Sequence, residues 1–132
     1  MLSLETCKAL AEKYAEVREH HFRPGDMYFL RSPDGGFYEN GCAISTSDHY
    51  SRGEMWCPRL GDLLEIATTL LHREQPDELI AVMEWRYDGE PDFCCWVFGG
   101  KDAHGDRLSW KRIFGQGITP EDAVAEALLS CD

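Results

Sequence analysis

Hydrophobic positions three and four residues apart mark three stretches of the chain as amphipathic helices. Each stretch begins with residues that favour a helix start: Ser3 as an N-cap, Pro58 at the first helical position, and Thr119 followed by a proline and two acids. The predicted helices run from Ser3 to about Glu19, from Pro58 to about Arg73 and from Thr119 to Leu129.

Shorter runs of apolar and aromatic residues, bounded by turn signals, predict five strands. The turn signals Ser32–Gly36 and Tyr87–Pro91 each separate two runs, which indicates two hairpins. Asn40 and Gly41 interrupt the second run and predict a bulge or an early end. The predicted strands are Met27–Arg31, Phe37–Ile44, Leu79–Arg86, Phe93–Phe98 and Leu108–Phe114.

The resulting order of elements, α-β-β-α-β-β-β-α, is typical of an α+β fold. Strands that are joined by tight turns pair antiparallel, and helices must cover an apolar face of the sheet. We therefore expect an antiparallel sheet of about five strands with three helices packed mainly on one face. No repeat or low-complexity tract divides the chain, so residues 1–132 are expected to form a single domain.

The net charge of the chain limits the kinds of molecule that it is expected to bind. The chain has 24 acidic and 13 basic residues, and between Glu74 and Asp92 seven acids face Arg86 alone. Sequence-independent binding to nucleic acid needs clustered Lys and Arg, so direct contact with DNA or RNA is not expected. Anionic lipid is disfavoured for the same reason. The expected partner is another protein, and complementary charge favours a basic one.

The N-terminal residues lack a basic and then apolar leader, and no apolar run is long enough to span a bilayer. We therefore expect a cytoplasmic protein without a membrane segment. The six cysteines show no framework spacing, so they are expected to be reduced thiols packed as small apolar side chains.

The polar stretch Ser45–Cys57 is the main candidate for chemistry, since loops of this length are usually functional or disordered. Cys42, His49 and Cys57 offer the sulfur and nitrogen donors that zinc prefers, or a thiol activated by an imidazole. However, the paired spacings of structural zinc sites are absent, and so are the P-loop and nucleophile-elbow motifs. We assign no cofactor, metal or catalytic residue from the sequence, and the balance is against an enzyme.

The aromatic residues favour a binding surface. Alternation along Phe93–Phe98 gives both faces of this strand apolar residues, so the strand is either covered on both sides or exposed to a partner. Trp residues anchor protein interfaces. The predicted protein-binding residues are Trp85 and Trp96 with the acids Glu78, Glu84 and Asp88, and packing in the core is the alternative.

Two helix-entry segments, Trp56–Leu64 and Gly117–Leu129, resemble those of small orphan proteins encoded by phages, prophages and other bacterial mobile elements. The resemblance implies no activity and no site residue. Many such small acidic proteins are inhibitors or immunity factors, so it implies a non-catalytic binder.

The leading hypothesis is a non-catalytic protein-binding module, an inhibitor or accessory factor of a basic partner that handles nucleic acid. One alternative is a small metal- or thiol-dependent enzyme that uses Cys42, His49 and Cys57. A second alternative is a structural homo-oligomer, such as a homodimer.

Overall fold

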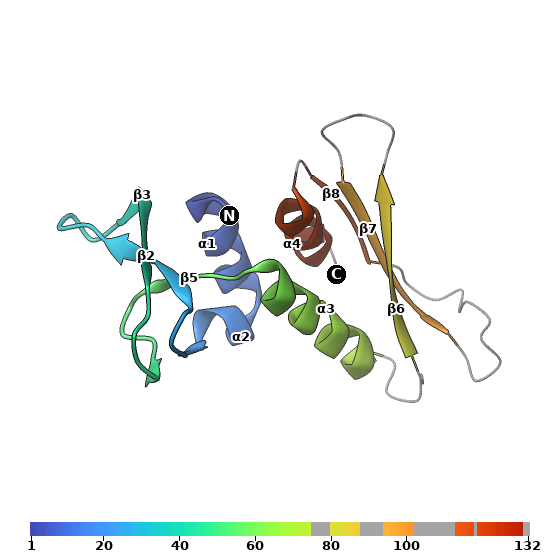
Figure 1. Cartoon of the computed structure of the whole chain (residues 1–132), viewed down its shortest axis with the longest axis horizontal. Helices are drawn as coiled ribbons and strands as arrows, with labels where there is room; N and C mark the ends of the chain where they lie inside the picture. Colours follow the sequence, from blue (N-terminus) through green and yellow to red (C-terminus); the bar gives the residue numbers. More distant parts are fainter. Residues whose placement is uncertain (75–79, 88–93, 102–112, 118, 131–132) are drawn as a thin grey trace. The chain divides into compact units, whose positions relative to one another are not determined.

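The computed structural model describes residues 1–74, 80–87, 94–101, 113–117 and 119–130, and its side chains over residues 1–69, 117 and 119–130 (Figure 1). The chain divides into two compact units, Met1–Arg59 (unit 1) and Leu60–Asp132 (unit 2). The predicted α+β class with antiparallel strands is confirmed. The described strands form three separate sheets instead of the predicted single sheet of about five strands. Among the described pairings, strands of unit 1 pair with strands of unit 1, in two sheets, and strands of unit 2 pair with strands of unit 2. The single domain over residues 1–132 stays a prediction.

The first predicted helix is divided in two. It ends as α1 (Leu4–Lys13) because the backbone of Tyr14 is extended, and the chain then forms α2 (Ala15–Arg18). The guanidinium of Arg18 donates a hydrogen bond of 2.9 Å to the carbonyl oxygen of Ala11. This bond satisfies one of the carbonyl groups that the end of α1 leaves without an intrahelical partner. The break is therefore stabilised by a side chain that the helical pattern places on the solvent face.

The described strands of unit 1 form two antiparallel sheets, β1-β4 and β3-β2-β5. The hairpin of β2 and β3 has the predicted bounds. The stretch predicted as a polar loop contains β4 and β5, which are too short to produce a periodic pattern. The strands are β1 (His21–Phe22), β2 (Met27–Arg31), β3 (Phe37–Ile44), β4 (His49–Tyr50) and β5 (Met55–Cys57).

The predicted irregularity near Gly41 is confirmed by the register of β2 and β3. Phe29 pairs with Cys42 whereas Arg31 pairs with Phe37, so β3 uses three more residues than β2 over the same span. A Cβ atom added at Gly41 would lie 3.0 Å from the Cβ atom of Tyr38. The close approach of β3 to itself therefore favours glycine at this position.

Unit 2 is a three-stranded antiparallel sheet with two helices, α3 (Leu60–Glu74) and α4 (Pro120–Ser130). The strand order is β6-β7-β8, so β7 is central, and the predicted hairpin of β6 and β7 is confirmed. Both helices lie on the same side of the sheet and contact each other (Figure 1). The strands are β6 (Ile80–Tyr87), β7 (Cys94–Lys101) and β8 (Ile113–Gly117). Residues 108–112 of the last predicted strand lie outside the described residues.

The start of α4 follows the predicted capping pattern. The hydroxyl of Thr119 accepts a hydrogen bond of 3.2 Å from the backbone N–H of Asp122, as an N-cap residue does. Its own hydrogen is donated to the Asp122 carboxylate, with 2.8 Å between the oxygens. The helix then buries Val124 and Leu128.

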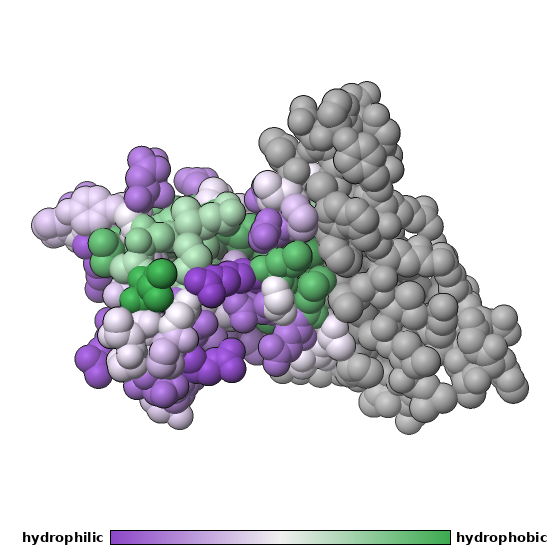
Figure 2. Space-filling view, viewed as in Figure 1, coloured by the Kyte–Doolittle hydropathy of each residue, from purple (hydrophilic) through white to green (hydrophobic). Residues whose placement is uncertain are grey.

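Five large apolar side chains of unit 1 are exposed. Figure 2 shows an area of apolar surface on this unit, in the part of the view where Figure 1 places β2, β3 and α1. The exposed residues are Met1, Leu30, Tyr38, Ile44 and Tyr50. In the described part of the chain, no helix is both long and apolar enough to cross a membrane.

Candidate functional site

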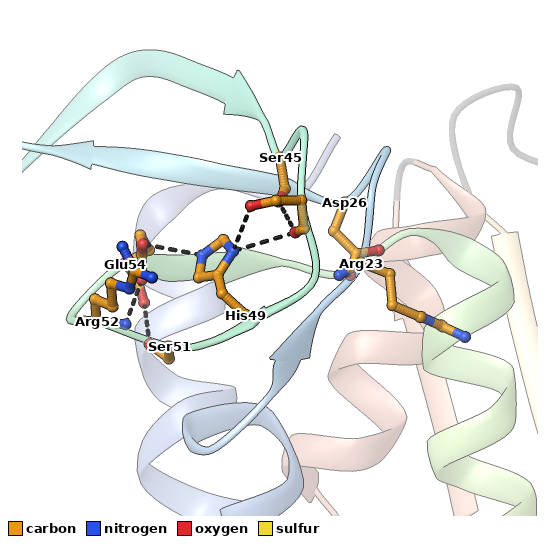
Figure 3. Close-up of polar contacts among 8 residues, drawn as sticks. Arg23, Asp26, Ser45, His49, Ser51, Arg52 and Glu54 are labelled. Atoms are coloured by element: carbon orange, nitrogen blue, oxygen red, sulfur yellow. Dashed lines mark hydrogen bonds and ion pairs between the residues drawn. The ribbon is translucent and has the colours of Figure 1, made fainter.

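The stretch that the sequence singles out is organised around His49, at the start of β4 (Figure 3). Its Nε2 atom lies 3.2 Å from Oε1 of Glu54, and its Nδ1 atom lies 3.2 Å from the carbonyl oxygen of Ser47. The ring stacks on Phe22, with 5.2 Å between centroids and 9° between planes. The His49 side chain is only 15% exposed, so the ring is clamped between polar and aromatic neighbours.

Glu54 makes further hydrogen bonds within the same stretch of chain. Its Oε2 atom accepts a hydrogen bond of 2.5 Å from the backbone N–H of Arg52, and its carbonyl oxygen accepts one of 3.3 Å from the hydroxyl of Ser51. Burial raises the pKa of Glu54, but hydrogen bonds to its carboxylate from the backbone of Arg52 and of Glu54 itself, together with the one with His49, outweigh burial and leave the pKa lowered. The carboxylate is thus held in its charged form.

Ser47, His49 and Glu54 together resemble a serine, histidine and acid arrangement, but the hydrogen bonds indicate a structural role. A general base needs a ring nitrogen that is free to take a proton from the nucleophile. Nδ1 of His49 faces both the carbonyl oxygen of Ser47 and its hydroxyl, the latter at 3.5 Å. The nearer of these two contacts is with the carbonyl oxygen, which can only accept, so it requires a proton on Nδ1 and leaves this nitrogen unable to take one from the hydroxyl. The other ring nitrogen, Nε2, is bound to Glu54. The three residues tie the loop together.

A second histidine and carboxylate pair lies in the same unit, at a place where the sequence indicated only a helix end. Nε2 of His20 lies 2.8 Å from Oδ2 of Asp26, which also accepts a hydrogen bond of 2.9 Å from the backbone N–H of Arg23. The His20 ring stacks on Trp56 at 3.4 Å with 2° between planes. The Trp56 indole nitrogen is buried without a hydrogen-bond partner. Burial raises the pKa of Asp26, but the bonds from Arg23 and His20 outweigh it and lower the pKa.

These two carboxylates predict an acid-sensitive fold. Their pKa values lie below the ordinary 3.8 of Asp26 and 4.5 of Glu54, so the folded chain binds fewer protons than the unfolded chain. Their contribution to stability is present above the ordinary values and is lost as the pH falls through 4.5 and 3.8 towards the folded values. Thermal unfolding followed by circular dichroism should show Tm falling as the pH is lowered from about pH 5 towards about pH 3.

The variants Asp26→Asn and Glu54→Gln provide the control for this pH dependence. Each should lower Tm near neutral pH and make the fall of Tm with acidification shallower, because the titrating carboxylate is gone. If both variants kept the slope of the unmodified chain, other groups would be responsible for the acid sensitivity.

The structure brings two of the three candidate ligands together and leaves the third elsewhere. Cys42 and Cys57 interact with each other through their side chains, whereas His49 is engaged with Glu54. The additional neighbour of Cys57 is Cys7 of α1. Sequence reasoning missed Cys7 because it occupies an ordinary apolar position of the first helix, 50 residues before Cys57. Within the described ranges, no group of three or more His, Cys, Asp or Glu residues has the geometry to hold a metal ion.

Three of the predicted protein-binding residues lie on the sheet of unit 2. Glu84 and Trp85 are on the edge strand β6, and Trp96 is on the central strand β7. The Cα atoms of Trp85 and Trp96 are direct partners in the register. Glu78 and Asp88 lie outside the described residues. The structure therefore juxtaposes the two tryptophan positions that the sequence identified, one on the edge strand and one on the central strand of the described sheet.

The negative charge of the chain is concentrated in the unit that carries this sheet. Unit 2 contains 15 acidic and 6 basic residues, whereas unit 1 contains 9 acidic and 7 basic residues. Electrostatic attraction of a basic partner would therefore act mainly on unit 2.

Comparisons of the chain with protein families, with curated proteins and with solved structures found no match. Function is therefore inferred from the chemistry and arrangement of the residues themselves.

Proposed function

We propose that the chain is a non-catalytic protein-binding module, an inhibitor or accessory factor, whose sheet in unit 2 receives a basic protein. The observation that carries the proposal is the arrangement of this sheet. The described helices α3 and α4 lie on one side of it, and its central strand has apolar residue types on both faces. A strand with apolar residues on both faces needs a layer on each side of the sheet, and we assign the layer opposite α3 and α4 to another molecule.

The register of the sheet supports an aromatic anchor. Trp85 and Trp96 occupy paired positions on adjacent strands, so two of the residues that most often dominate binding energy are neighbours in the sheet. Glu84 directly precedes Trp85 on the edge strand, so the two residues occupy alternate positions on opposite faces of the sheet. We therefore assign Glu84 to the long-range attraction of the partner and not to contact with the aromatic pair.

Charge favours a foreign basic partner over a second copy of the chain. Unit 2 has an excess of nine acids over bases, so two identical sheets would repel each other when they approach. A basic protein would instead be attracted, and the aromatic residues would slow its dissociation. This difference distinguishes the proposal from the homo-oligomer alternative, which a mass measurement in solution tests directly.

The experiment is a capture assay with three forms of the tagged chain in host lysate at low and at high salt. The first is unmodified, and the second carries Glu78→Lys, Glu84→Lys and Asp88→Lys. We expect one basic partner that the unmodified chain retains at low salt and loses at high salt. For the charge-reversed form, the association rate with the purified partner should fall by about tenfold or more at low salt, because steering is lost.

The third form carries the same change of net charge at three exposed acids of unit 1, Glu12, Glu19 and Glu39. This control should keep the partner, since the proposal assigns the attraction to one sheet and not to the net charge of the whole chain. An association rate and salt dependence that the reversal of Glu78, Glu84 and Asp88 leaves unchanged would refute the proposal.

A further inference from the structure

Three of the six cysteines of the chain gather in unit 1, and the protein-binding proposal makes no use of them. Cys7 and Cys57 are 0% and 1% exposed, whereas Cys42 is half-buried. Cys7 lies on the buried face of α1, and α1 contacts β5, which carries Cys57. The Cys57 sulfur lies 4.0 Å from the carbonyl oxygen of Leu2, just before the same helix.

The position of each cysteine decides which pair can be joined. Cys42 pairs with Phe29 on one side of β2, and Cys57 pairs with Met27 on the other side. Neighbouring strands are about 4.8 Å apart, so β3 and β5 are separated by roughly 9.6 Å. A disulfide needs Cα atoms within about 7 Å, so Cys42 and Cys57 cannot be bridged without moving the backbone. Cys7 approaches Cys57 from the helix packed on β5, where this restriction does not apply.

The interactions of the thiols match this geometry. The hydrogen bond from the Cys7 thiol is the largest cause that lowers the pKa of Cys57 to about 7, against burial, which raises it. The same bond and burial raise the pKa of Cys7. Of this pair, Cys57 is therefore the thiol that more readily becomes a thiolate, the form that reacts with electrophiles, while Cys7 keeps its proton.

We propose that Cys7 and Cys57 form a dithiol site that is oxidised by hydrogen peroxide to an intramolecular disulfide. The Cys57 thiolate attacks one peroxide oxygen, forming an S–O bond and breaking the O–O bond, and the leaving hydroxide takes up a proton to become water. The Cys7 sulfur then attacks the sulfenic sulfur, forming the S–S bond and breaking the S–O bond. The second hydroxide leaves with the proton of Cys7 as water, so the two thiols supply the two electrons that reduce the peroxide.

The burial of Cys57 determines which oxidants can reach its sulfur. The sulfur of a residue that is only 1% exposed is reached by a molecule of the size of hydrogen peroxide far more readily than by a bulky disulfide such as oxidised glutathione. The half-buried Cys42 lies at the side of the site, in contact with Cys57 but unable to bridge to it. Burial raises the pKa of the Cys42 thiol, whereas the pKa of Cys57 is lowered, so Cys57 is the better nucleophile for the attack on the peroxide.

The test is peptide mapping of the full chain after brief treatment with hydrogen peroxide and blocking of free thiols. Trypsin places the three cysteines in separate peptides, residues 1–8, 32–52 and 53–59. We expect a cross-linked species of peptides 1–8 and 53–59 that is two hydrogens lighter than their sum and disappears on reduction. Oxidised glutathione at the same concentration should give at least about tenfold less of it, because attack depends on access.

Two matched variants complete the test. Cys42→Ala should still give the cross-link. Cys7→Ala should abolish it, so that the sulfenic acid of Cys57, formed more slowly without the hydrogen bond from Cys7, is labelled by a sulfenic-acid probe. A bridge between peptides 32–52 and 53–59, or three thiols that all remain free for blocking after peroxide, would overturn the proposal. The mapping of the unmodified chain gives this answer even if Cys7→Ala fails to fold.

Discussion

Replacing Phe22 with alanine is expected to lower the free energy of unfolding by about 3–5 kcal/mol. Phe22 is 0% exposed and lies at the centre of an aromatic cluster. Its ring stacks on His49 and meets the edges of His20 and Tyr28, with centroids 5.2, 5.2 and 5.8 Å away. Truncation would leave a cavity and remove the support of both histidine and carboxylate pairs. Urea unfolding followed by circular dichroism measures the loss.

The matched control is Tyr50→Ala on the strand that pairs with β1. Tyr50 is 73% exposed, and its ring contacts His21 with 4.5 Å between centroids. Removing it should cost less than about 1 kcal/mol, because little apolar surface returns to water. Equal losses for Phe22→Ala and Tyr50→Ala would show that the aromatic cluster does not stabilise unit 1.

Gly117→Ala is expected to destabilise unit 2 by about 1–3 kcal/mol or more. A Cβ atom at Gly117 would lie 2.7 Å from the Cβ atom of Asp122 and 2.8 Å from the backbone nitrogen of Ala123. The second contact involves the backbone of the first turn of α4, so no side-chain rotation can relieve it. The substitution should separate the end of β8 from the helix and lower the midpoint of thermal unfolding.

Gly61→Ala is the control of opposite sign. Gly61 lies in the first turn of α3, and an added Cβ atom would meet no atom within 4 Å. Alanine should stabilise the helix by about 0.5–1 kcal/mol, because it restricts the unfolded chain. If Gly117→Ala and Gly61→Ala changed the midpoint alike, the close contact between β8 and α4 would not be the cause.

The elements that follow strong local signals could be predicted from the sequence. The turn at Ser32–Gly36 and the capping pattern at Thr119 each define a boundary through nearby residues, and both are found as expected. The break at Tyr14 could not be predicted, because Arg18 stabilises it through a carbonyl group seven residues earlier. The strand β5 is three residues long and depends on pairing with β2, so it leaves no periodic pattern.

The candidate sites show the same division between local and distant signals. The antiparallel pairing of the two tryptophan strands could be predicted from the turn, but its register could not. Strands that end at Arg86 and begin at Phe93 would place Cys94 opposite Trp85, whereas the observed partner is Trp96. The meeting of Cys7 with Cys57 depends on how α1 packs against β5, for which a single sequence gives no signal. His49 was identified by residue type alone, and its actual partners are the neighbouring Glu54 and Ser47.

The irregular register of β3 affects how readily the protein aggregates at high concentration. Within the described strands, β3 is an eight-residue edge strand with the exposed apolar side chains Tyr38 and Ile44. A long apolar edge strand of this kind favours aggregation, because the edge strands of two copies can pair with each other. Between the positions that pair with Arg31 and Phe29 of β2, β3 has three extra residues, which distort this edge. Glu39 places a charge within the distorted segment. A regular template for cross-β growth is thereby interrupted in its middle, and the unit is protected against aggregation by the same bulge that requires Gly41.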